Sequence, residues 1–137
     1  MFVITNYQAH LGDVRFLRLE IDRTAAGVVI LQALAMCCDD REIQRACTRL
    51  ARRQMGQVRR LQLLLVWHSG RWRRVPDMCP YLPDCHGALG LIYLEMQAGA
   101  TRLGAQAQAT ECCHTGRLCQ SLAAERAEAA QVLAALL

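Results

Sequence analysis

Proline is confined to one short stretch of this 137-residue chain. The three prolines, Pro76, Pro80 and Pro83, lie within eight residues of one another. Because proline interrupts helices, the proline-free segments on either side can hold long ones. Hydrophobic residues make up 53% of the chain and charged residues 20%, which is enough apolar material for a core and argues against disorder. The length fits a single domain spanning residues 1–137.

Apolar residues at three- and four-residue spacing predict four amphipathic helices, and no sustained alternation predicts a strand. The expected ranges are 13–36, 40–67, 87–109 and 115–137, with residues 68–86 as the connector. Asp13 is expected to cap the first helix, and Asp39 with Glu42 the second, because carboxylates favour the positive helix end.

The chain also matches itself at a shift of 75 residues. Cys37-Cys38 falls on Cys112-Cys113, and Leu19-Glu20 on Leu94-Glu95. Each half then reads as a helical hairpin, over residues 12–67 and 87–137. Two hairpins with short loops predict an all-α, up-down four-helix bundle.

Two segments resemble a known family. Residues 16–24, Phe-Leu-Arg-Leu-Glu-Ile-Asp-Arg-Thr, and residues 49–58 resemble the two motifs of the domain-of-unknown-function family 305. The resemblance covers nearly the whole chain and implies a ferritin-like bundle of duplicated hairpins. It implies that the family's paired histidines, its expected metal ligands, are replaced by Arg23-Thr24 and by Ala98-Gly99. Gln57 stands where the second motif has a glutamate, so the inherited metal site is expected to be lost.

The eight cysteines are expected to be free thiols or metal ligands. The start of the chain lacks the basic region and the long apolar run of a signal peptide, and no apolar run near it could span a bilayer. A cytoplasmic location is therefore expected, unless a leader was trimmed, and disulfides are rare there. Cys47 and Cys119 fall at core spacing and are expected to be inert.

A soft-metal site is one hypothesis for the remaining cysteines. If both hairpin loops lie at one end of an up-down bundle, they bring together the side chains of Cys37, Cys38, Cys112, Cys113 and His114. Thiols and imidazole suit Zn or Cu. The alternative is that these loops only bury small apolar side chains under the helix ends.

A second cysteine group is expected at the opposite end of the bundle. It comprises Cys79, Cys85 and His86, with His68 and His10 nearby. The spacing of the two cysteines suits half a metal site or a disulfide within the loop, and an incidental pair of thiols in a proline-rich crossover is the alternative.

The basic residues are concentrated in the first half, and all of them are arginine. Residues 41–74 hold ten arginines and one acid, with Trp67 and Trp72 among them. Arginine beside tryptophan suits phosphate contact and base stacking. The candidate anion-binding residues are Arg59, Arg60, Arg71, Arg73 and Arg74.

The motifs of common enzymes are missing from the sequence. It contains no phosphate-binding glycine loop and no HExxH, and Glu-x-x-His occurs once, at Glu111 and His114. We therefore expect a non-catalytic bundle that binds a soft metal ion or a protein partner. The alternative is a module that binds anions or nucleic acid. Self-association stays open, and no membrane partner is expected.

Overall fold

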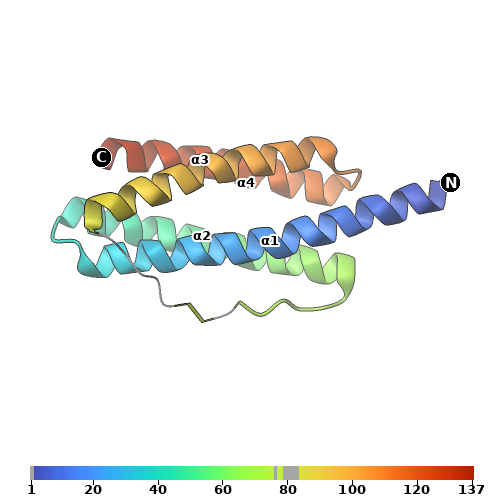
Figure 1. The fold of residues 1–137 in the computed structure, drawn as a ribbon, viewed down its shortest axis with the longest axis horizontal. Coiled ribbons are helices and arrows are strands. Elements are labelled where there is room, and N and C mark those ends of the chain that lie inside the picture. Colours follow the sequence, from blue (N-terminus) through green and yellow to red (C-terminus); the bar gives the residue numbers. More distant parts are fainter. Residues whose placement is uncertain (1, 76, 79–83) are drawn as a thin grey trace.

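The computed structural model describes residues 2–75, 77–78 and 84–137, and these form a bundle of four helices (Figure 1). The helices are α1 (Phe2–Cys37), α2 (Arg41–Ser69), α3 (Cys85–Ala109) and α4 (Cys113–Leu136). No strand occurs in this described part of the chain. The predicted all-α four-helix bundle is confirmed.

The four helices are arranged as two close pairs. Helix α1 packs along α2, and α3 along α4, while the pairs meet more sparsely through α1 against α3 and α2 against α4. Every one of these neighbours is antiparallel, yet α2 and α3 run in the same direction (Figure 1). The connector between α2 and α3 therefore returns along the length of the bundle.

Two contacts fix which loops share an end of the bundle. A disulfide joins Cys38, in the α1–α2 loop, to Cys85, the first residue of α3. At the other end, His68 in the last turn of α2 contacts Thr115 in the first turn of α4. The α1–α2 and α3–α4 loops thus lie at opposite ends. The expectation that they meet at one end is wrong, because the long connector crosses the bundle before α3 begins.

Helix α1 begins eleven residues earlier than its capping signal suggested. Gly12, which precedes the expected cap, lies inside the helix, because glycine in a helix interior costs only about 1 kcal/mol. Asp13 consequently lies within α1, where it is 3% exposed and accepts hydrogen bonds from Gln106 and Thr110.

The other helix starts show which residues cap them. Asp40, rather than Asp39, caps α2 by accepting hydrogen bonds from the backbone N–H groups of Glu42 and Ile43. Asp84 caps α3 in the same way. Cys112 occupies the cap position of α4 but makes no side-chain cap bond.

The apolar core is divided into two clusters, one toward each end of the bundle. Buried positions of α2 and α4 correspond between these clusters, and each corresponding pair is 72 residues apart: Cys47 and Cys119, Leu50 and Leu122, Leu61 and Leu133. These pairs differ from the predicted shift of 75. The two Cys-Cys pairs that the shift aligns occupy different places, since Cys38 follows α1 whereas Cys112 precedes α4.

Candidate functional site

The four loop cysteines do not gather into one site. Cys37 and Cys38 lie at the opposite end of the bundle from Cys112, Cys113 and His114. Cys38 is moreover bonded to Cys85, whereas Cys37 and Cys113 are exposed free thiols. The proposed soft-metal cage is therefore not formed.

The second predicted cysteine group is also divided. Cys85 and the exposed His86 begin α3, while His10 and His68 lie at the far end of the molecule. Cys79 lies outside the described residues. Within the described ranges, no three or more His, Cys, Asp or Glu side chains converge as a metal cage requires.

Cys47 and Cys119 are core residues, as the sequence predicted. Both are fully buried. Burial raises the pKa of the Cys47 thiol to about 11. Burial, together with the nearby Asp13 and Glu20 carboxylates, raises the pKa of Cys119 to about 12. Both thiols therefore stay protonated and unreactive at neutral pH.

A buried polar layer separates the two apolar clusters, with Arg126 at its centre. The Arg126 guanidinium is 1% exposed and donates to Gln57 Oε1 at 2.7 Å, Glu20 Oε1 at 3.2 Å and Thr24 Oγ1 at 2.6 Å. These acceptors come from α1 and α2, so the guanidinium joins the second hairpin to the first. Close beside it, Gln54 Oε1 is buried with no hydrogen-bond partner among the described residues.

The charges of this layer balance. Glu20 is fully buried and also accepts from Arg102, which in turn reaches Glu95 at 2.7 Å. Burial lowers the pKa of Arg126, and the Glu20 carboxylate acts in the opposite direction. Two guanidinium groups and two carboxylates therefore form one neutral network, which reduces the electrostatic cost of burial.

Gly99 makes room for Arg126. A Cβ atom at this position would lie 2.6 Å from Arg126 Nη1, closer than any normal contact. The guanidinium is held by hydrogen bonds to three acceptors. A side chain at position 99 would therefore force Arg126 to shift against these bonds.

Histidines gather at the end of the bundle where α2 stops and α4 starts. His10 Nδ1 lies 3.2 Å from His68 Nδ1, and His68 Nε2 lies 2.8 Å from Thr115 Oγ1. The Trp67 ring packs edge-on against both His68 and His114, at centroid separations of 5.0 Å and 5.2 Å. Burial lowers the pKa of His68; Asp13 opposes that shift, and His10 and His114 reinforce it.

The predicted anion-binding arginines are divided by their ion pairs. Arg73 makes a bidentate pair with Asp22, and Arg60 pairs with Glu125. Arg59, Arg71 and Arg74 are exposed and belong to no ion pair formed by the described residues.

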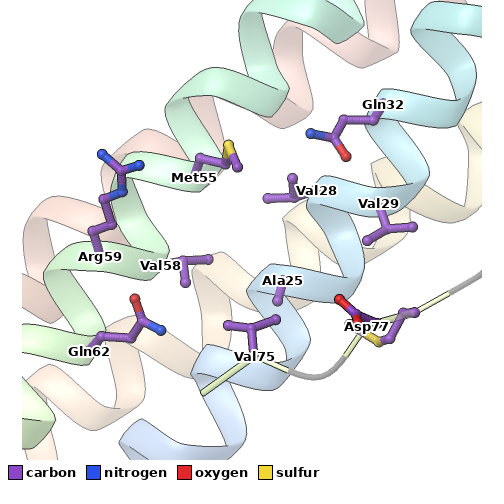
Figure 2. A pocket seen from close by; sticks show the side chains of 11 residues that line it. Ala25, Val28, Val29, Gln32, Met55, Val58, Arg59, Gln62, Val75 and Asp77 are labelled. Atoms are coloured by element: carbon purple, nitrogen blue, oxygen red, sulfur yellow. The ribbon is translucent and has the colours of Figure 1, made fainter. Parts of the chain in front are cut away.

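An open groove runs along the seam between α1 and α2. Its first part encloses about 400 Å³ beside the connector (Figure 2). Ala25, Val28 and Val58 contribute apolar surface, and Arg59 and Asp77 stand on opposite sides (Figure 2). Two contacts of Arg73 hold the connector beside this part of the groove. The Arg73 side chain donates to Asp22 of α1, and the Gln62 side chain of α2 donates to the Arg73 carbonyl.

The groove continues toward the α1–α2 loop. A second hollow of about 340 Å³ shares Gln32 and Met55 with the first and adds Ala35, Met36 and Arg52. Three methionines line the groove and all are exposed, with exposed fractions of 83% for Met36, 46% for Met55 and 37% for Met78.

Arginines stand at regular intervals along the α2 side of this groove. Arg59 and Arg52 line the first and second hollows, and Arg45 lines an adjoining hollow that shares Ala35, Thr48 and Arg52 with the second. All three arginines are exposed, lie seven residues apart and belong to none of the ion pairs among the described residues. Seven residues are close to two helical turns, so the three arginines follow one another along one face of α2 at intervals of about 10 Å. The α1 side carries no arginine; its lining residues are Ala25, Val28, Val29, Gln32, Ala35 and Met36.

Comparison with protein-family models, curated proteins and solved structures found no match. None of the helices, searched over the described residues, is long and apolar enough to cross a membrane.

Several of these features were visible in the sequence but were not recognised. The seven-residue spacing of Arg45, Arg52 and Arg59 is one. Arg126 is another, since it interrupts the apolar stripe that joins Leu122 to Ala129. The sequence placed His10 and His68 at the same end of the bundle but did not indicate that their rings touch, because 58 residues separate them.

Proposed function

We propose that this bundle is a non-catalytic interaction module that receives an acidic amphipathic helix of a partner protein in the α1–α2 groove. One observation carries the proposal: a row of exposed arginines, spaced seven residues apart, stands beside a methionine-rich apolar groove. A helix laid in such a groove buries its apolar face. Methionine side chains adapt readily to an incoming surface.

Charge and spacing favour a helix over other anionic ligands. An α-helix with Glu or Asp at every seventh residue brings one carboxylate near each of Arg45, Arg52 and Arg59, as flanking charges do in helix–helix seams. From Ala25 to Met36 the lining residues follow about 16 Å of α1, and Arg45 to Arg59 follow about 21 Å of α2, which suits three to four turns of a bound helix.

The resemblance to family 305 supports a function other than metal binding at the centre of the bundle. Thr24, Gly99 and Gln57 stand at the positions of the family's paired histidines and glutamate, and all three touch or make room for Arg126. A guanidinium already occupies this centre and would repel a metal cation there. The single long crossover between α2 and α3 is the connection found in ferritin-like bundles, and it supports a ferritin-like topology for this chain.

The test uses a fluorescein-labelled three-heptad helical peptide with leucine on one face and glutamate at every seventh position. We expect saturable binding that weakens as salt is raised. Replacing Arg45, Arg52 and Arg59 together with Gln should reduce affinity at least tenfold. The matched control replaces three exposed arginines that do not line the groove, Arg15, Arg23 and Arg117, and removes the same charge.

A second variant separates apolar contact from charge. Met55 is half exposed, so Met55→Glu should leave the fold intact while abolishing peptide binding. If the peptide does not bind at 100 µM, or if both arginine triples weaken binding equally, the groove is not the binding surface and the proposal is overturned.

Single-stranded nucleic acid is a second candidate ligand, because Trp67 and Trp72 are 63% and 58% exposed near the unpaired Arg71 and Arg74. This candidate predicts salt-dependent oligonucleotide binding that Trp72→Ala weakens and Met55→Glu leaves unchanged.

A further inference from the structure

The histidine pair at the end of the bundle has the geometry of two metal ligands. His10, from α1, and His68, from α2, direct their Nδ1 atoms at each other across 3.2 Å. When two imidazoles bind one tetrahedral ion at about 2.0–2.1 Å, their ligating nitrogens stand about 3.3 Å apart. The observed separation is close to the one that a shared ion would impose.

We propose that His10 and His68 bind one divalent transition-metal ion through their Nδ1 atoms, with water completing its coordination. Imidazole nitrogen suits Zn²⁺, Cu²⁺ and Ni²⁺. The site has no connection with the cysteine cage predicted from the sequence. It lies at the end of α2, away from the groove side chains, and does not depend on the proposed function.

The surroundings of His68 support this assignment. Its second ring nitrogen, Nε2, lies 2.8 Å from the hydroxyl of the fully buried Thr115. When Nε2–H donates to that hydroxyl, Nδ1 carries the free lone pair. An outer hydrogen bond of this kind fixes the tautomer and the ring orientation in metal-binding histidines.

The local charge also favours a cation. Asp13 follows His10 by one helical turn, is 3% exposed and is held by Gln106 and Thr110. Its carboxylate acts on His68 electrostatically. Both histidines are only partly buried, which leaves access for the ion and for water ligands.

The ion itself is the probe, applied to the tag-free chain of 137 residues. Free thiols would bind the same metals, so the background variant carries Ser in place of four cysteines that lie neither in the core nor in the disulfide: Cys37, Cys79, Cys112 and Cys113. Calorimetric titration with ZnCl₂ at pH 7.5 should give one ion per chain with a micromolar Kd. His10→Gln and His68→Gln should each weaken binding at least tenfold. His86→Gln, an exposed histidine at the other end, should have no effect.

Trp67 supplies a second measurement, since its ring contacts His68. Stoichiometric Cu²⁺ should quench its fluorescence in the background variant but not in His68→Gln, and circular dichroism should show equal helix content in both. If Zn²⁺ shows no saturable binding below 1 mM, the two rings form only a hydrogen bond. If His86→Gln weakens binding as much as His68→Gln, the assignment to this pair is wrong.

Discussion

At the scale of single residues, the buried position of Arg126 depends on the absence of a side chain at Gly99. Because a Cβ atom at position 99 would lie 2.6 Å from Arg126 Nη1, we expect Gly99→Ala to lower the free energy of unfolding by about 1–3 kcal/mol. The matched control is Gly104→Ala in the same helix, where no atom lies within 4 Å. That change should raise stability by about 0.5–1 kcal/mol, because alanine favours helix. Urea unfolding of both variants measures the difference, and equal effects would show that Arg126 moves aside freely.

His68 makes the fold sensitive to acid. Its pKa in the folded state is lowered, chiefly by burial, so its stabilising contribution is complete above the unfolded value of about 6.5. As the pH falls below that value, the unfolded chain takes up the proton first and stability is lost, down to the folded pKa. Between pH 7.5 and 5.5, the melting temperature should therefore fall more in the native chain than in His68→Gln. An equal fall in both would show that His68 is not the source of the acid sensitivity.

At the scale of residues, the sequence predicted burial correctly for side chains that follow the apolar period of a helix. Leu17, Ile21 and Val28, which follow the three- and four-residue spacing of the first predicted helix, are buried, and so are Cys47 and Cys119. It failed for Glu20 and Arg126, because charged side chains are normally assigned to a solvated surface. Their burial depends on partners from other helices, and no local pattern reveals such pairing.

The helices differ in how well their starts are capped, and α4 is the weakest. Asp40 and Asp84 each accept backbone hydrogen bonds at the starts of α2 and α3, whereas Cys112 makes none for α4. Serine prefers this position, so Cys112→Ser should stabilise the fold by about 1 kcal/mol. Cys113→Ser, one residue further on, is the control and should be nearly neutral. Thermal unfolding of the two variants decides the point, and a neutral Cys112→Ser would mean that water already satisfies this helix end.

At the scale of elements, the sequence predicted the number and order of the helices but not the direction of the second hairpin. Capping residues and apolar periods are local, and they placed three of the four helix starts within two residues. The direction of α3 depends on where the connector travels. Its proline-rich sequence is compatible with either a tight turn or a long crossover, so the loops were assigned to the wrong ends.

The disulfide matters most at the scale of the whole molecule. Cys38 and Cys85 close a loop of 47 residues that includes all of α2 and the connector. In the chain-entropy model, a crosslink of this length stabilises a fold by about 4 kcal/mol. Cys38→Ser should therefore lower the melting temperature markedly under non-reducing conditions. Dithiothreitol should lower the melting temperature of the native chain but leave that of Cys38→Ser unchanged. A native chain insensitive to the reductant would show that the bond adds little.

The buried polar layer also bears on which hairpins can associate. The first hairpin contributes a carboxylate, Glu20, and the second contributes two guanidinium groups, Arg102 and Arg126. Two copies of the first hairpin would enclose two Glu20 carboxylates with neither of these arginines to neutralise them. Two copies of the second would crowd four guanidinium groups around two Glu95 carboxylates. Pairing of two identical halves would therefore bury unbalanced charge. We expect the two halves, made as separate peptides, to form mixed pairs in preference to identical ones.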